Sequence, residues 1–181
     1  IGSPPCTMFS LLQNLNLEIR DEAWKAKFRE RLEDAKEHVR FCIRLYRLQR
    51  QAGRYFLHEH PKTATSWKME EVESLLAMED VIRAEADQCR YGLMTKVKGE
   101  VLPAKKSTSF LTNSWAIAQE LSRKCKGDHR HGHLIEGRAR AAQIYPPGLC
   151  NAICRGLRKQ IDHDESGRTV SHAMTIEELS S

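Results

Sequence analysis

The feature that most constrains this chain is a long helical stripe between two short apolar segments. Asp21 is a good N-cap, and apolar side chains recur after it at steps of three and four residues until Gly53. The stripe consists of Trp24, Phe28, Leu32, Ala35, Val39, Ile43 and Tyr46. Residues 1–3 resemble the end of a strand, and residues 54–58 resemble a buried strand. A strand, a long helix and a second strand predict a parallel pair joined by a crossover helix.

The rest of the sequence continues this alternation. Further strands are predicted at residues 81–86 and 108–112, and further helices begin at Ser66, Ser114 and Pro146. We therefore predict an α/β fold over residues 1–158, with a largely parallel sheet and flanking helices. Residues 159–181 are polar and acidic with no apolar stripe, which predicts a disordered tail.

Two reactive side chains follow the first two predicted strands. Cys6 comes directly after the stiff Pro4-Pro5 turn, and Glu59 follows the apolar segment 54–58. The carboxyl ends of parallel strands share one sheet edge, so both side chains are expected in one crevice. An exposed cysteine of lowered pKa is a nucleophile, and a partly desolvated glutamate of raised pKa can carry a proton. The alternative is that Cys6 is a small packed residue and Glu59 a capping or ion-paired one.

Composition places the chain among globular proteins with a mildly basic surface. The net charge of +5 suits a polyanionic partner such as DNA. No apolar run approaches the ~20 residues needed to cross a bilayer, so no membrane partner is expected. The six cysteines are spread through apolar and helical contexts, which predicts reduced thiols in an intracellular protein, nuclear if the source is eukaryotic.

Four segments resemble the DNA cytosine-5 methyltransferase family, in their order and spacing. Residues 2–10 (GSPPCTMFS) resemble its Pro-Pro-Cys nucleophile loop, in the Pro-Pro-Cys-Thr variant of phage-type members. Residues 56–61 (FLHEHP) are similar to its strand ending in Glu-Asn-Val or Glu-Asn-Pro. The segments CRYG at 89–92 with KKSTSFLTN at 105–113, and AAQIYPPGLCNAI at 141–153, resemble the later part of the domain. Similar segments occur inside retrotransposon-like polyproteins, which implies a domain embedded in a longer polypeptide.

The resemblance implies the C-terminal portion of a Rossmann-like methyltransferase fold. It implies that Cys6 adds to carbon 6 of a flipped cytosine while Glu59 bonds ring nitrogen 3 and the exocyclic amine. Carbon 5 would then take a methyl group from S-adenosylmethionine. The implied substrate-binding residues are Pro5, Ser10, Lys105, Lys106 and Thr108, and the implied cofactor-binding residues are Pro4 and Asn151.

Two departures from the family pattern bear on activity. The glycine-rich loop and the acidic residue that precede the nucleophile loop in the family are absent before Ile1, so the methyl donor is expected to bind weakly or not at all. His60 stands where the family has an asparagine that supports the loop. No target-recognition domain is evident. The alternative function is a non-catalytic nucleic-acid-binding or assembly module of a retroelement polyprotein.

A zinc site is the remaining rival. The loop that contains Cys125, His129, His131 and His133 offers four metal-binding side chains within nine residues. No Cys-x-x-Cys pair accompanies it, and alternating histidines of one loop do not easily close a tetrahedron. The prediction is therefore a basic loop without a metal.

Overall fold

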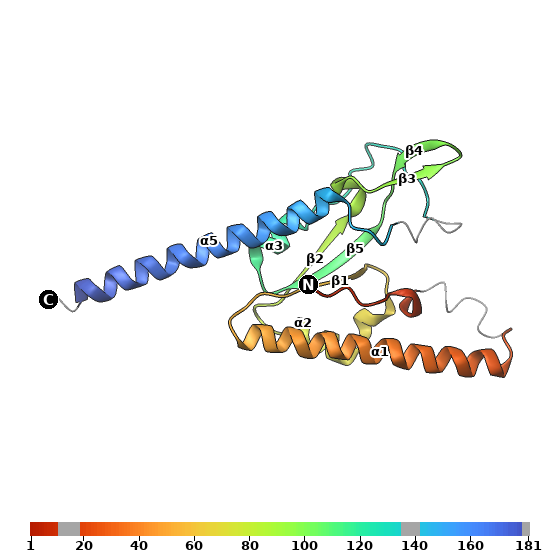
Figure 1. The fold of residues 1–181 in the computed structure, drawn as a ribbon, viewed down its shortest axis with the longest axis horizontal. Helices are drawn as coiled ribbons and strands as arrows, with labels where there is room; N and C mark the ends of the chain where they lie inside the picture. The colour runs from red at the N-terminus through yellow and green to blue at the C-terminus, as the bar shows by residue number, and fades with distance from the viewer. Residues whose placement is uncertain (11–18, 135–141, 179–181) are drawn as a thin grey trace.

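The computed structural model describes residues 1–10, 19–134 and 142–178, with side chains described as far as residue 167. A three-stranded sheet lies between two layers of helices (Figure 1). The sheet consists of β1 (Leu57–Pro61), β5 (Ser107–Thr112) and β2 (Ile82–Asp87) in that order. One layer contains α1 (Glu22–Gln51) and α2 (Glu70–Leu76), and the other contains α3 (Trp115–Glu120) and α5 (Pro147–Glu178).

The short elements connect these layers. The 3-10 helices are η1 (Thr7–Phe9), η3 (Thr65–Lys68) and η4 (Gln88–Tyr91). A separate hairpin is formed by β3 (Met94–Val97) and β4 (Glu100–Pro103), with Gly99 at φ +89° in its turn. This hairpin lies at the end of the sheet, beyond β2 and β5 (Figure 1).

The prediction of a largely parallel, Rossmann-like sheet is wrong, because β5 pairs antiparallel with both β1 and β2. The chain passes from β2 to β5 through η4 and the β3–β4 hairpin, with no crossover helix. Without such a helix the chain re-enters the sheet from the end at which it left, so β5 runs opposite to β2. The predicted alternation of strands and helices did not include the β3–β4 hairpin. Gly2 and His58 form the one parallel pairing among the described residues.

The predicted N-terminal caps of α1 and α3 are confirmed. The Asp21 carboxylate accepts a hydrogen bond from the Trp24 amide at 2.7 Å, and Ser114 caps α3 through the Ile117 amide at 3.2 Å. Ser66 does not cap α2, because it lies within η3 and its hydroxyl bonds His60. None of the helices in the described ranges is long and apolar enough to cross a membrane.

The last helix continues well past the predicted domain boundary at residue 158. α5 is helical to Glu178, and its C-terminal part extends away from the rest of the chain (Figure 1). Gln160 is buried and accepts a hydrogen bond from Ser114 at 2.8 Å, and Asp164 accepts one from Tyr55. Packing contacts therefore reach at least Asp164, whereas the division at residue 158 stays a prediction.

Candidate functional site

Cys6 and Glu59 lie in the wall of one cavity, which we call the Cys6 cavity. Its volume is about 270 Å³. It is lined by Ser3, Pro4, Pro5, Cys6, Thr7, Glu59, Lys106 and Gln143. An apolar cavity of ~150 Å³ holds one benzene ring, so the Cys6 cavity has room for one pyrimidine among polar groups. The two residues that the sequence placed in one crevice are therefore brought together, in spite of the antiparallel sheet.

The backbone of the first residues explains this proximity. The Gly2 amide donates to the Leu57 carbonyl at 2.8 Å, and the Glu59 amide donates to the Gly2 carbonyl at 2.9 Å. Residues 1–3 thus lie parallel beside β1, as the strand–helix–strand pattern predicted. A Cβ at Gly2 would lie 1.8 Å from the Tyr46 hydroxyl, so only glycine fits between β1 and α1 here.

The sequence predicted that Glu59 follows the end of a strand. In the structure it lies inside β1. It faces Phe110 of β5 in the antiparallel register. Because side chains alternate along a strand, Glu59 shares the face of Leu57, whereas His58 and His60 lie on the opposite face toward α1. Pro61 ends the strand two residues later.

His60 fixes the turn that carries Cys6. Its Nε2 lies 3.0 Å from the Pro4 carbonyl and its Nδ1 lies 2.6 Å from the Ser66 hydroxyl. The carbonyl can only accept, so Nε2 carries the proton and Nδ1 accepts from Ser66. Burial lowers the pKa of His60, which keeps the ring neutral and this tautomer in place. His60 therefore holds the turn that carries Cys6 by hydrogen bonds of its own.

The Glu59 carboxylate has one bound and one unbound oxygen. Oε2 accepts a hydrogen bond from the Ser3 hydroxyl at 2.6 Å. Oε1 is buried and has no hydrogen-bond partner among the described residues. The Lys106 ammonium lies 3.6 Å from Oε1, close enough for electrostatic attraction but beyond the usual distance of an N–H···O bond. Oε1 is thus a buried acceptor near Lys106 and Tyr145, on a residue that lines the cavity.

The two lysines expected near the substrate have separate positions. Lys106 lines the cavity, and its ammonium also donates to the Ala142 carbonyl at 3.2 Å. Lys105 is exposed and does not line the cavity. Thr108 is fully buried and does not line the cavity. Its hydroxyl donates to the Lys106 carbonyl at 3.2 Å and accepts from Gln88 at 2.9 Å, so it supports the backbone of Lys106.

The remaining predicted residues divide between two cavities and the surface. Pro4 and Pro5 line the Cys6 cavity, and Ser10 lines a second, more apolar cavity of about 360 Å³. The two cavities share Cys6, Thr7, Lys106 and Gln143. Asn151 is exposed on α5 and lines neither cavity. Neither of these two cavities therefore brings Pro4 and Asn151 together.

The Cys6 thiol is protonated at neutral pH in this setting. Burial raises its pKa above the ordinary value of 9.0, and the negative charge of Glu59 adds to that effect. Lys106 acts in the opposite direction, as does the hydrogen bond from the Cys6 backbone amide. The nucleophile expected from the sequence is thus held as a thiol, which must lose its proton before it reacts.

The His-rich loop forms a group of a different composition from the one in the sequence analysis. Cys125, His129 and His131 converge with Cys89, which comes from η4, and their sulfur and nitrogen atoms all lie within 4.8 Å of one another. His133 does not belong to this group. No sequence pattern connected Cys89 with this loop, because 35 residues lie between it and Cys125.

Sequence reasoning also missed three residues around Glu59. Ser3 holds one carboxylate oxygen, Gln143 lines both cavities, and the buried Tyr145 hydroxyl has no hydrogen-bond partner among the described residues. Burial, with the nearby Glu59 charge, raises the pKa of Tyr145, so it remains a phenol. All three lie within segments singled out in the sequence, Ser3 in residues 2–10 and the other two in residues 141–153, but the positions of their side chains beside Glu59 depend on the fold.

Comparison with known proteins gives no further assignment. No family model, no curated protein and no solved structure matches this chain. The function proposed for the Cys6 cavity is therefore argued from its geometry and from the residues that resemble the methyltransferase segments.

Proposed function

We propose that the Cys6 cavity binds one cytosine of DNA and activates its carbon 5 for methylation. The observation that carries this proposal is the buried Glu59 Oε1, which has no partner among the described residues and shares a cavity with a thiol. A buried acceptor left without a hydrogen bond costs about 1–3 kcal/mol, and a ligand that donates to it recovers that energy. The exocyclic amine of cytosine is such a donor, and it lies beside ring nitrogen 3.

The proposed chemistry uses Cys6 as nucleophile and Glu59 as the group that holds the ring. After the thiol gives its proton to water, the Cys6 sulfur forms a bond to carbon 6 and the electrons of the carbon 5–carbon 6 double bond make carbon 5 nucleophilic. Glu59 acts here in its protonated form: it donates its proton to nitrogen 3, which takes up the charge that develops in the ring, and accepts a hydrogen bond from the amine. Carbon 5 takes an electrophile and nitrogen 3 returns its proton to Glu59. Carbon 5 then gives its own proton to water, and the electrons of that bond re-form the double bond and expel the Cys6 thiolate.

The methyl donor is the part of the proposal that this chain does not provide. S-adenosylmethionine, where it is bound, would supply the methyl group, but Pro4 and Asn151 do not form a site for it. The residues of the Cys6 cavity bind, orient and activate the base. On this proposal the donor is held by another part of a longer polypeptide.

A cytosine stacked inside duplex DNA cannot enter the cavity beside the half-buried Cys6 thiol. The Cys6 cavity has room for one base, so the target must leave the base stack, which costs a few kcal/mol in duplex DNA and less in single strands. Lys106 places a positive charge in the cavity wall near both Cys6 and Glu59, where it can attract a phosphate or the developing charge of the ring. Single-stranded DNA is therefore the more sensitive substrate for a first test.

The test needs no methyl donor, because reversible addition of Cys6 lets carbon 5 exchange its hydrogen. A cytosine-containing single strand is incubated with the 181-residue chain in deuterated buffer, and deuterium at carbon 5 is measured by mass spectrometry. We expect exchange above the rate without protein, increasing from pH 7 toward pH 9 as the Cys6 thiol ionises. Cys6→Ser should abolish it, and Glu59→Gln should slow it roughly 10²–10³-fold.

Two controls separate this chemistry from simple binding. Cys150→Ser changes an exposed cysteine outside the Cys6 cavity and should leave the exchange rate unchanged. Salt-dependent DNA binding without any exchange in the wild-type chain would reject the catalytic proposal and favour the non-catalytic nucleic-acid-binding module. Exchange that survives Cys6→Ser would show that another group is the nucleophile.

A further inference from the structure

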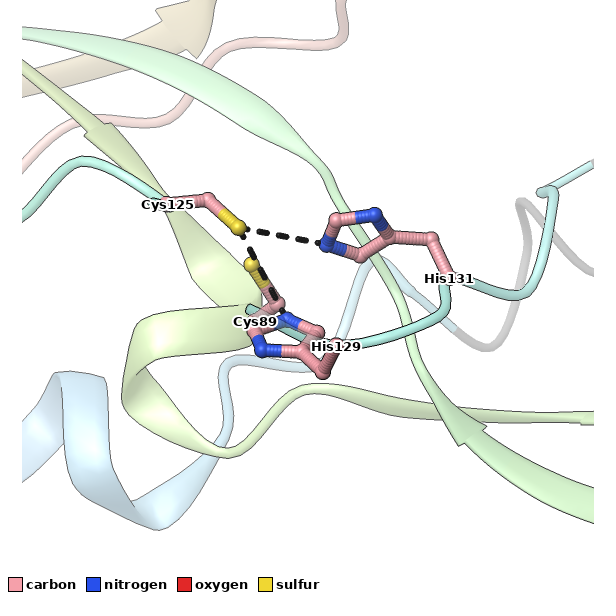
Figure 2. Close-up of side chains that lie close together, drawn as sticks. All are labelled: Cys89, Cys125, His129 and His131. Atoms are coloured by element: carbon pink, nitrogen blue, oxygen red, sulfur yellow. Dashed lines mark hydrogen bonds between the residues drawn. The ribbon is translucent and has the colours of Figure 1, made fainter. Parts of the chain in front are cut away.

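Four side chains with metal-binding atoms meet at one point outside the Cys6 cavity. Figure 2 shows the sulfur atoms of Cys89 and Cys125 and the ring nitrogens of His129 and His131 directed toward one another. Cys89 belongs to η4, directly after β2, and the other three belong to the loop after α3. Two unconnected segments thus contribute to the cluster, which answers the objection that one loop cannot close a tetrahedron.

The distances in the cluster fit a tetrahedral zinc ion. Zinc binds thiolate sulfur at ~2.3 Å and imidazole nitrogen at ~2.0–2.1 Å, so a sulfur and a nitrogen on one tetrahedral ion lie about 3.5 Å apart. The Cys125 sulfur lies 3.4 Å from His131 Nε2 and 3.7 Å from His129 Nε2. Two thiolates and two imidazoles are also the ligand set that favours zinc over magnesium or calcium.

The atoms around the cluster support bound thiolates and oriented imidazoles. His129 directs Nε2 toward Cys125, while its Nδ1 lies 2.8 Å from the Asp128 carboxylate. A carboxylate on the far nitrogen fixes the tautomer and raises the basicity of a ligating histidine. The Gly127 amide lies 3.4 Å from the Cys125 sulfur and donates to it, which stabilises negative charge on that sulfur.

Further contacts hold the two segments in register. Arg90, which follows Cys89, bonds the Asp128 carboxylate at 3.1 Å, and the Cys125 amide donates to Asp87 at 2.8 Å. Beyond the cluster, the Gly132 amide donates to the Pro103 carbonyl at 2.9 Å, which attaches the loop to the β3–β4 hairpin. The loop therefore has contacts on both sides of the four side chains.

We propose that Cys89, Cys125, His129 and His131 bind one Zn²⁺ as a structural site. Four protein ligands complete the tetrahedron and leave no position for a water or substrate, so the ion acts as a cross-link. It would join η4 to the loop after α3. It would thus stabilise the end of the sheet where β2 ends and where β5 begins, next to Lys106. This proposal does not depend on the function of the Cys6 cavity.

The first test measures metal in the wild-type chain. The protein is stripped with a chelator, given Zn²⁺ and dialysed, and we expect one ion per chain by elemental analysis. Co²⁺ in its place should show the visible bands of a tetrahedral site and a sulfur-to-metal charge-transfer band. His131→Ala should lose stoichiometric binding and these bands, whereas His133→Ala in the same loop should keep both.

The second test uses only the wild-type chain, so it does not depend on whether a variant folds. Zn²⁺ should slow alkylation of Cys89 and Cys125 at least tenfold in the wild-type chain, as read by peptide mass spectrometry. The exposed Cys150 and Cys154 should be alkylated at the same rate with and without the ion. A chain that binds less than a tenth of an equivalent of zinc would overturn the proposal. So would a Cys89–Cys125 disulfide in a metal-free chain, or equal binding by the His131→Ala variant.

Discussion

The two faces of the three-stranded sheet are packed in different ways. On the α1–α2 face the buried layer includes large aromatic rings, and His58 and His60 pack among them. The His58 ring lies 5.4 Å from that of Trp67 and the His60 ring 5.5 Å from that of Phe9, measured between centroids. This face therefore combines apolar burial with two polar rings that need partners.

The α3–α5 face is packed by small residues and close backbones. Its buried layer includes Ala84, Ala86, Ala118 and Ala152. A Cβ at Gly156 of α5 would lie 2.7 Å from the Ile117 Cα, and one at Gly148 would lie 2.3 Å from the Tyr91 carbonyl oxygen. Helices can approach this closely only where the side chains between them are absent.

The comparison shows what each face does for the Cys6 cavity. The α1–α2 face positions the turn that carries Cys6, since Phe9 anchors its far end and the His60 ring donates to its Pro4 carbonyl. The small-residue face carries Glu59 on the strand and Tyr145 beside it. We therefore expect the first face to be sensitive to lost rings and to protonation, and the second to added volume.

The largest effect is expected from loss of the anchoring ring. Phe9→Ala should lower the free energy of unfolding by about 3–5 kcal/mol, because it removes a ring that is 2% exposed from the α1–α2 face. Urea denaturation at pH 7.5 measures this. Phe41→Ala on the exposed side of α1, where the ring is 49% exposed, should cost less than about 0.5 kcal/mol. Similar losses for both variants would show that Phe9 is not an anchor.

Protonation is expected to weaken the same face at mildly acid pH. Burial, together with the neighbouring His60, lowers the pKa of His58 to about 3 from an ordinary value of 6.5. The unfolded chain therefore takes up a proton near pH 6.5 while the folded chain does not. This contribution to stability is complete above pH 6.5 and is lost as the pH falls from 6.5 toward 3. Between pH 7.5 and 5 the loss should be about 2 kcal/mol from His58 alone.

Urea denaturation of matched variants at the two pH values assigns this loss. His58→Gln removes the titrating ring, so its stability should fall about 2 kcal/mol less than that of the wild type. His38→Gln, on the exposed side of α1, should behave as the wild type does. The Glu85 carboxylate, whose pKa is lowered to about 2 from an ordinary value of 4.5, loses its contribution mainly below pH 4.5, and the wild type and both variants share that loss. An unchanged pH dependence in His58→Gln would show that this ring titrates normally in the folded chain.

The sequence predicted the first of these faces better than the second. The stripe of α1 and its Asp21 cap are local signals, and both are present in the structure. The strand–helix–strand pattern also placed residues 1–3 beside β1, which brings Cys6 and Glu59 to one cavity. What failed was the β2–β5 connection, because a hairpin of four-residue strands has no period long enough to distinguish it from a loop.

The residues missed around the two sites share one property, which is distance along the chain. Cys89 meets Cys125 only because η4 folds back toward the loop after α3, and Gln143 reaches the Cys6 cavity from the far end of the sequence. Spacing rules treat ligands on one segment, so they included His133 and omitted Cys89. The role of His60 could not be predicted for another reason. Its ring holds the Cys6 turn only because the Pro4 carbonyl points toward it, and the direction of that carbonyl is determined by the fold.

The smallest effect distinguishes the packed part of α5 from its open part by sign and not by size. Alanine is favoured over glycine inside a helix by about 1 kcal/mol, so Gly167→Ala should stabilise the chain by up to that amount, because nothing lies within 4 Å of the new methyl. Gly156→Ala gains the same propensity but places its methyl 2.7 Å from the α3 backbone. Separating two packed helices costs roughly 1–3 kcal/mol, so this variant should be destabilised by about 1 kcal/mol on balance. Thermal unfolding of both variants measures the difference, and stabilisation of Gly156→Ala would mean that α5 does not pack tightly on α3.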